Sequence, residues 1–312
     1  MNLMLPVTTV LPIFFYMAAG ALLRSLKKLS DSTVAQMNKI IFSYLFPFVM
    51  FNNIYKTELD KVLNGPFLAV MLGLVLLTAL LAVLFIPRFT DKKPVQGSMI
   101  QAIIRGNSIL FALSVVSTIA GPENTGLASL CVAVVVPIYN IICVIVLETL
   151  RGGSLKPLNL GLSLLKNPLI MGALLGIGAQ LIDLKLPRVF EDIISDAASL
   201  VTPLALLMLG AGLKFSDTLS YRREIILVAI VKLLIIPLVY VLVVKLMGFD
   251  RVALTTALAM SSVPTAVSTY VMAQEMGADG VLAGQLVAVT SVLSIVTVFL
   301  WVLLLSSIGW IG

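Results

Sequence analysis

Apolar stretches of about 20 residues, the length that spans a bilayer, recur along the 312-residue chain and constrain its fold more than any other feature. Lipid offers the backbone no hydrogen-bonding partners, so only helices and closed barrels cross it. A composition of 60% apolar and 12% charged residues excludes an ordinary soluble domain. The chain is therefore predicted to be an all-α membrane protein.

Ten stretches are expected to span the membrane. They cover residues 5–24, 38–54, 66–88, 97–120, 125–148, 167–184, 193–213, 224–247, 251–275 and 280–306. The connecting loops are too short to form a soluble domain. The first span lacks a clear small-residue cleavage site and is longer than a signal peptide requires, so it is expected to remain in the protein.

Prolines and glycines recur at corresponding positions in the two halves of the sequence. A shift of 156 residues, half the length of the chain, brings together Pro12 with Pro168, Gly20 with Gly176, Pro47 with Pro203, Gly121 with Gly277 and Gly153 with Gly309. Residues 1–156 and 157–312 would each hold five spans, an odd number, so the second half must enter the membrane from the opposite side. Inverted repeats around a midplane binding site are a recurring architecture of secondary transporters.

The net charge of +6 is distributed unevenly between the two sides of the membrane. If alternate loops face the cytoplasm, that side holds Arg24, Lys27, Lys28, Lys39, Arg88, Lys92, Lys93, Arg151, Lys156, Lys166, Lys214, Arg222 and Arg223, and the other side holds Lys56, Lys61, Lys185, Arg188, Lys245 and Arg251. This bias follows the positive-inside rule for a multi-pass protein of the inner (plasma) membrane with both termini outside. It indicates topology, and no nucleic-acid partner is expected.

The sequence offers little for covalent or cofactor chemistry. It has no histidine, and no phosphate loop, Rossmann fingerprint or metal-ligand cluster is present. Cys131 and Cys143 lie in one span, about 18 Å apart along a helix, which is too far for a disulfide. We expect no enzyme activity, no cofactor, no metal and no ATP-driven transport by this chain alone.

A proline and polar residues interrupt the ninth span. Ser261, Ser262, Pro264 and Thr265 lie at mid-membrane, where a spanning helix is normally continuous and apolar. Proline fits the first turn of a helix, with a preceding serine as N-cap. The pattern predicts two half-helices, the second starting near Pro264, whose free amides can hold an anion. A simple proline kink is the alternative.

The fourth span, which corresponds to the ninth, carries Gln101, Arg105, Gly106, Asn107 and Ser108. Glycine followed by asparagine can end one half-helix and cap another, whose amides would also point at the midplane. Arg105 either faces the interior or snorkels to the cytoplasmic surface. Asn107 either binds substrate or an ion, or forms a hydrogen bond between helices.

Further polar residues lie in spans 5, 8 and 2. Tyr139 and Asn140 either complete a polar pocket beside the break in span 4 or bond across the bundle. Lys232 in span 8 faces the interior or snorkels. Asn52 and Asn53 are interpreted as an ordinary helix cap near the outer surface. No carboxylate is clearly at the midplane, so a coupling ion, proton or sodium, would be held by carbonyls and hydroxyls, or a proton would travel on the substrate.

Six short motifs follow one another across the spans. They are Arg105-Gly106-Asn107, Pro137-Ile138-Tyr139-Asn140, Asn167-Pro168-Leu169-Ile170, Leu209-Gly210-Ala211-Gly212-Leu213, Pro264-Thr265-Ala266 and Leu282-Ala283-Gly284-Gln285. In this order, and over nearly the whole chain, they resemble the auxin efflux carrier family, which includes bacterial malonate and malate carriers and is related to plant auxin exporters.

The resemblance implies two inverted five-span repeats with crossed, broken spans 4 and 9, a fold similar to bile-acid and sodium/proton carriers. It implies a scaffold of spans 1, 2, 6 and 7, usually dimeric, beside a moving transport domain of spans 3–5 and 8–10. By residue match, Asn107, Tyr139 and Asn140 line the substrate pocket, the region around Phe51 faces it, and Pro264 marks the crossing point.

One departure from the family pattern concerns span 4. Family members commonly carry glycines and a proline after the asparagine, where Ile109, Ala112 and Ser114 stand here. Span 4 is therefore expected to be less sharply broken than span 9.

These features lead to one functional hypothesis. The protein would be a secondary active transporter of a small organic anion, a mono- or dicarboxylate, working by elevator-like alternating access as a homodimer in the lipid bilayer. The two half-helix starts, with Ser262, Pro264 and Thr265 at the second, would attract the carboxylate, and Arg105 or Lys232 would add positive potential. An ion or solute channel, or a transporter of a neutral or cationic solute, is the alternative.

Overall fold

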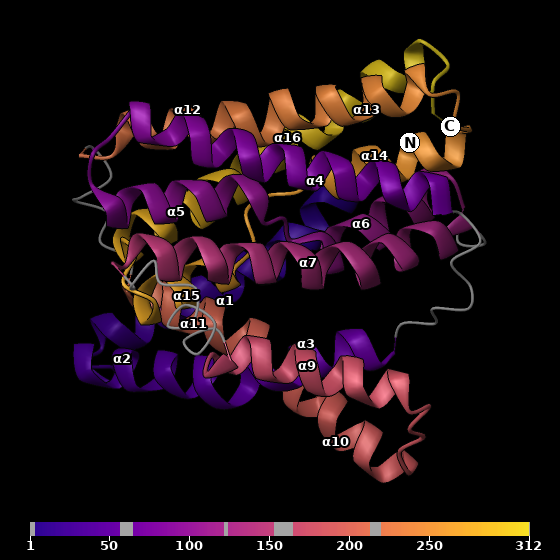
Figure 1. Cartoon of the computed structure of the whole chain (residues 1–312). Helices are drawn as coiled ribbons and strands as arrows, with labels where there is room; N and C mark the ends of the chain where they lie inside the picture. The colour runs from indigo at the N-terminus through magenta and orange to yellow at the C-terminus, as the bar shows by residue number, and fades with distance from the viewer. Residues whose placement is uncertain (1–3, 57–64, 122–123, 153–164, 213–219, 312) are drawn as a thin grey trace.

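The computed structural model of the chain describes residues 4–56, 65–121, 124–152, 165–212 and 220–311 (Figure 1). Within these residues the structure is helical, and the β-type pairing is limited to an isolated bridge between Gly106 and Thr265. The prediction of an all-α protein is confirmed. The boundary between the halves at 156–157 lies outside the described residues, as do Lys61, Lys156 and Lys214.

The helices coincide with the predicted spans, and several spans are built from more than one segment. The first half contains α1 (Met4–Ser25), α2 (Asp31–Ile40), the π-helical turn η1 (Ile41–Leu45), α3 (Phe46–Tyr55), α4 (Gly65–Phe85), the 3-10 turn η3 (Ile86–Arg88), α5 (Lys93–Ile104), α6 (Ser108–Ile119) and α7 (Gly126–Leu150). The second half contains α9 (Pro168–Leu181), α10 (Arg188–Ser199), α11 (Val201–Gly212), α12 (Arg222–Ile230), the π-helical turn η6 (Val231–Ile235), α13 (Ile236–Leu246), α14 (Arg251–Ser261), α15 (Ser268–Glu275) and α16 (Gly280–Ser307).

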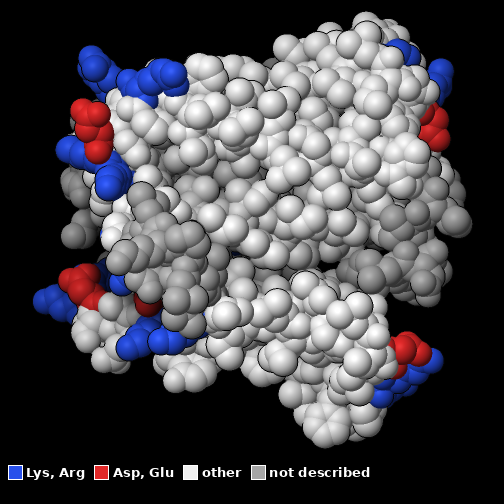
Figure 2. Space-filling model, viewed as in Figure 1, with Lys and Arg blue, Asp and Glu red and all other residues white. Residues whose placement is uncertain are grey.

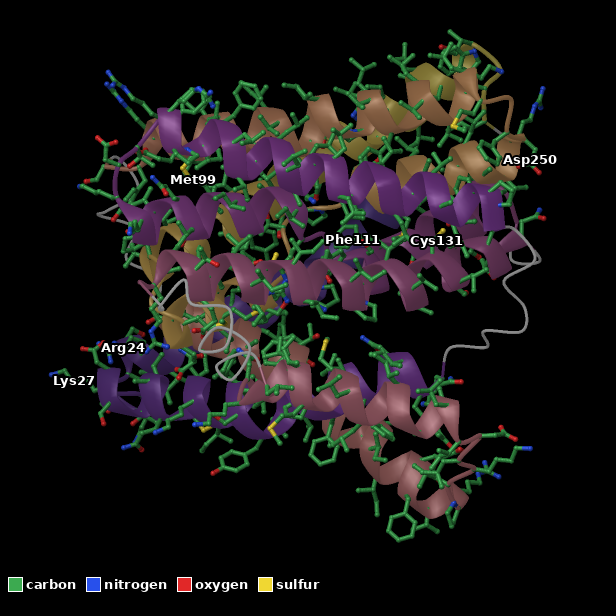
Figure 3. All side chains as sticks on the ribbon, in the orientation of Figure 1. Arg24, Lys27, Met99, Phe111, Cys131 and Asp250 are labelled. Carbon is green, nitrogen blue, oxygen red and sulfur yellow. The ribbon has the colours of Figure 1, made fainter. Side chains whose placement is uncertain are left out.

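Six continuous helical runs among the described residues are long and apolar enough to cross a membrane. They are Asp31–Tyr55, Gly65–Arg88, Gly126–Leu150, Arg188–Gly212, Arg222–Leu246 and Gly280–Ser307. In the face shown in Figure 2, charged side chains gather at the two ends of the helices and the belt between them is uncharged. Arg24 and Lys27 lie at one end and Asp250 at the other (Figure 3). This distribution suits a protein surrounded by lipid.

Capping residues explain where several helices begin. Ser30 caps α2 by accepting from the Thr33 amide, so the second span starts at Asp31 and not at residue 38. Asp250 caps α14 and Asp279 caps α16 in the same way. Asn167 caps α9, with Pro168 in its first turn. The seventh span also starts earlier than predicted, at Arg188 directly after Pro187.

The two halves of the chain pack into each other. Helix α1 of the first half lies against α11 of the second, and α9 of the second lies against α3 of the first. A Cβ atom at Gly20 would lie 1.9 Å from the Leu207 carbonyl oxygen, and one at Gly176 would lie 3.2 Å from the Phe51 carbonyl oxygen. These contacts are related by the same 156-residue shift, since 207 − 156 = 51. Glycine permits this close backbone approach.

The other helices form a second packed group. Helix α5 contacts α4, α7, α15 and α16, and α14 contacts α6, α7 and α13. In Figure 1 this group occupies the upper part of the view, and α2, α3, α9 and α10 occupy the lower part. Helices α6 and α15 also reach the first group, through α1 and through α2 and α11 respectively. The candidate site lies where the two groups meet.

Candidate functional site

The fourth and ninth spans are both broken, and the two breaks pair with each other. Residues 105–107 connect α5 to α6 as non-helical backbone, and residues 262–267 connect α14 to α15. The Asn107 amide donates to the Pro264 carbonyl at 2.9 Å, and the Ala266 amide donates to the Arg105 carbonyl at 3.3 Å. A simple proline kink in span 9 is therefore wrong.

The ninth span differs in detail from the prediction. Ser262 is the C-cap of α14, and α15 begins at Ser268, so the prediction of a half-helix starting near Pro264 is wrong by four residues (268 − 264). The reason is tertiary, because the Pro264 carbonyl and the Thr265 amide are engaged with Asn107 and with the Thr290 hydroxyl. Six residues are non-helical here against three in span 4, in line with the expectation that span 4 is less sharply broken.

Side-chain hydrogen bonds also hold the crossover together. The Thr265 hydroxyl donates to the Ala102 carbonyl at 3.1 Å, and the Tyr139 hydroxyl donates to the Gly106 carbonyl at 2.8 Å. A Cβ atom at Gly106 would lie 2.5 Å from Val263 Cγ2, so only glycine fits at this crossing. Buried carbonyls freed by the breaks thus obtain partners, which lipid could not supply.

A cavity of about 740 Å³ lies beside the crossover, between the two groups of helices. One wall comes from the broken spans and α7, and includes Arg105, Asn107, Ser108, Tyr139, Asn140 and Ser268. The facing wall comes from α1, α3, α10 and α11, and includes Tyr16, Met50, Asn52, Asn53, Ser195, Ser199 and Thr202. Arg105 is the one charged side chain among the described residues that line it.

Arg105 is held inside the protein and does not snorkel. Its side chain is 1% exposed, and its guanidinium donates to the Ser268 hydroxyl and to Met272 Sδ on α15. Its Nε has no partner among the described residues. The ion pairs of the described chain, Arg24–Asp31 and Lys185–Asp183, lie elsewhere. Arginine stays protonated in proteins, so its charge faces the cavity without a carboxylate within 4 Å in the described structure.

Lys232 lies on the far side of the crossover. It is 3% exposed, sits in the π-helical turn η6, and donates from Nζ to the Ile103 carbonyl at 3.0 Å. Snorkelling is therefore wrong for this residue as well. Its ammonium group caps the negative end of α5 and does not line the large cavity. The end of the Lys232 side chain lies behind Gly106, 3.5 Å from where a Cβ atom would stand.

Asn107 and Asn140 present unpaired polar atoms at the cavity wall. Asn107 occupies the N-cap position of α6, but its side chain makes no cap bond and its Nδ2 has no partner within the described structure. Asn140 donates weakly to Met50 Sδ at 3.6 Å, and its Oδ1 is left without a described partner. Buried polar atoms normally have partners. Water or a bound solute would supply them here.

Two helix starts reach the same cavity. Ser108 opens α6 and Ser268 opens α15, and both line it. The first amides of a helix carry a partial positive charge that favours anions. Together with Arg105, they make this wall electropositive.

The structure brings some predicted site residues to the cavity and others to the crossover. Arg105, Asn107, Tyr139 and Asn140 line the cavity, with the Tyr139 hydroxyl already engaged. Ser262, Pro264 and Thr265 are buried in the crossover and are not in its lining.

Phe51 is also outside the cavity lining, because its ring stacks on Tyr55 with centroids 5.3 Å apart. Its neighbours Met50, Asn52 and Asn53 line the cavity instead. The interpretation of Asn52 as a helix cap is wrong, since its buried Oδ1 has no partner in the described structure. The amide pair Asn52-Asn53 inside an apolar span was the signal that could have indicated this wall.

Comparisons with known proteins show the family to which the chain belongs. Residues 6–159 and 158–302 each match the family described as "Membrane transport protein". The chain belongs to this family of membrane transport proteins, the auxin efflux carriers. The two consecutive matches also confirm that the halves are repeats, and the resemblance seen in the sequence motifs is confirmed. Membership makes the protein a membrane transporter and not an enzyme.

One curated relative and one solved structure are similar to this transporter. A Rhizobium meliloti (strain 1021) protein named "Putative malonate transporter" is 24% identical over 306 residues, covering 93% of this chain and 92% of that protein. The solved sodium proton antiporter MjNhaP1 from Methanocaldococcus jannaschii has a TM-score of 0.56 at 15% identity, covering 96% of this chain and 99% of that chain. The second similarity shows a shared fold.

Proposed function

We propose that the protein is a secondary active transporter of a small organic anion, a mono- or dicarboxylate. The observation that carries the proposal is the buried Arg105 guanidinium, which faces a cavity whose described lining contains no carboxylate. A buried charge without a partner is strongly unfavourable. A bound carboxylate would compensate it, with Asn107 and the starts of α6 and α15 as further donors. The name of the Rhizobium relative supports such a substrate.

We further propose that transport proceeds by elevator-like alternating access. In this scheme the ten spans form two inverted repeats of five, with α1–α3 and α9–α11 as the scaffold and α4–α7 and α12–α16 as the moving domain. The cavity is lined from both groups, so a bound solute would touch both and would travel when one slides on the other. Both termini would lie outside the plasma membrane, and the scaffold would form a homodimer. A proton or sodium ion would drive the cycle.

A channel and a carrier of neutral or cationic solutes are the competing functions. A cation would meet Arg105 and two positive helix starts in a cavity whose described lining offers no carboxylate, which disfavours it. A channel would give flux that does not saturate and is not stimulated by solute on the opposite side. Saturable counterflow therefore separates a carrier from a channel.

The proposal is tested with purified protein in proteoliposomes. Labelled malonate and malate are expected to show saturable counterflow, and thermal-shift measurements with and without sodium across pH would identify ligand and coupling ion. Asn107→Ala is expected to reduce the flux, whereas Gln36→Leu, an amide removed from the exposed face of α2, is expected to retain it. Equal flux for Asn107→Ala and Gln36→Leu would contradict the assigned site.

A further inference from the structure

The wall that faces Arg105 is polar but carries no charge among its described residues. Asn52 and Asn53 of α3, Ser195 and Ser199 of α10 and Thr202 of α11 line it. A second carboxylate in the cavity would find no second cation in this lining. The cavity is thus electrostatically matched to one negative charge, although it is large enough for a solute with two polar ends.

The cavity is lined by unpaired donors near Arg105 and by unpaired acceptors toward Met50 and Asn52 of α3. Beside Arg105 the unpaired atoms are donors, Nε of Arg105 and Nδ2 of Asn107. Toward α3 they are acceptors, Oδ1 of Asn52 and Oδ1 of Asn140, whose amide nitrogen already reaches Met50 Sδ on α3. A carboxylate accepts and cannot donate, so it suits Arg105 and Asn107 and cannot satisfy the oxygens of Asn52 and Asn140. The acceptors require a ligand group that carries N–H or O–H.

Charged residues lie beside this wall, outside the cavity lining. Helix α10 carries Glu191, Asp192 and Asp196 within eight residues of Ser199. Lys56 donates to Ser195 at 3.2 Å, and Tyr55 donates to Glu191 at 2.9 Å. Arg188 opens the same helix, so three carboxylates accompany two cations there. With one carboxylate in excess, these charges give the rim no net positive charge for a second anionic group.

We propose that the carrier binds monoanionic acids, with one carboxylate at Arg105 and a neutral hydrogen-bond donor against Asn52. A dicarboxylic acid is then bound in its half-protonated form, and its second carboxyl proton is donated to Asn52 Oδ1. This inference rests on the proposed function and deepens it. It also means that a dicarboxylate would bring its own proton into the cavity.

Binding of malonate, malonamate and monomethyl malonate to the purified carrier across pH tests the inference. Malonamate has a neutral amide that donates, and monomethyl malonate has a neutral ester that only accepts. Malonate affinity is expected to fall about tenfold per pH unit above its second dissociation, because the monoanion becomes that much rarer. Malonamate affinity is expected to stay constant over the same range and to exceed that of the ester about tenfold.

Variants of Asn52 test whether this residue causes the preference for the amide over the ester. Asn52→Leu is expected to lose the discrimination between amide and ester, and Gln36→Leu to keep it. Asn52→Asp retains size and an acceptor, so it is expected to bind malonamate and to bind malonate more weakly than wild type. If Asn52→Leu does not fold, as judged by thermal unfolding, the ligand series on wild type and Asn52→Asp still decides.

The outcomes separate the two proposals. Malonate affinity that is constant or rises with pH, together with no binding of malonamate, would overturn the monoanion inference and leave an anion carrier in place. Failure of malonate, succinate and their half-amides to bind at any pH would instead reject the proposed function. If a folded Asn52→Leu protein still discriminated between malonamate and the ester, Asn52 would not be part of the site.

Discussion

Replacing Gly172 with alanine tests the contact between α9 and α3. A Cβ atom there would lie 2.4 Å from the Pro47 carbonyl oxygen and 2.7 Å from Pro47 Cα. Ordinary van der Waals contact begins near 3.4 Å, so α9 must withdraw by 3.4 − 2.4 = 1.0 Å. The obstacle is backbone and cannot rotate away. Overpacking of this kind costs about 1–3 kcal/mol, and a gap near 1 Å forfeits up to about half the dispersion energy of the contacts it opens.

The same helix offers the control. Gly178 lies six residues further along α9 and is exposed. The methyl group of an alanine there would have nothing within 4 Å of it. Gly178→Ala is therefore expected to be neutral or to stabilise by up to about 1 kcal/mol through helix propensity.

Thermal unfolding of the two variants in one detergent measures the difference. Since 1 kcal/mol corresponds to about 2–4 °C in domains of 150–250 residues, Gly172→Ala is expected to melt roughly 2–12 °C below wild type. Gly178→Ala is expected to melt at or slightly above it. Equal melting temperatures for both variants would refute the close contact between α9 and α3 and the packing of the two halves built on it.

Three further predictions concern the site and the crossover. Arg105→Gln is expected to weaken carboxylate binding about 10- to 100-fold, because a hydrogen bond to a charged group is lost. Equilibrium binding measures this change. Undiminished affinity would exclude Arg105 as the anion's partner. Thr265→Val is expected to lower the free energy of unfolding by about 1–3 kcal/mol, because the Ala102 carbonyl loses its hydrogen-bond donor. Thr265→Ser keeps the hydroxyl and should retain stability. Equal stability of the two variants in calorimetry would contradict this hydrogen bond. Tyr139→Phe is expected to cost about 1 kcal/mol and to slow counterflow, since the Gly106 carbonyl is left unpaired, and full activity at unchanged stability would show that this bond is dispensable.

Local signals were enough to predict the helices and the places where two of them break. Span length follows from the thickness of the bilayer, and a proline or a Gly-Asn pair within an apolar run marks an interruption. The start of α15 could not be predicted from those residues, because Pro264 and Thr265 bond to Asn107 and Thr290, which are distant in sequence.

The phase of α3 illustrates a second limit. The π-helical turn at Ile41–Leu45 widens one turn of the second span, and this rotates everything after it by about one residue. Asn52 therefore faces the cavity and Phe51 faces away. Nothing in those five residues distinguishes a π-turn from an α-turn. The inward positions of Arg105 and Lys232 likewise depend on acceptors at Ser268 and Ile103 that only the folded chain provides.

The contact of Gly20 with Leu207 and of Gly176 with Phe51 has a consequence for biosynthesis. The opening helix of the chain docks on a segment that the ribosome makes almost 190 residues later (207 − 20 = 187). Until that segment is made, the face of α1 that carries Gly20 would contact lipid or proteins of the insertion machinery. Neither half can complete its packing alone, because each half supplies the surface on which the first helix of the other half docks. Two fragments divided between α7 and α9 should assemble when made together, and each should be degraded when made separately.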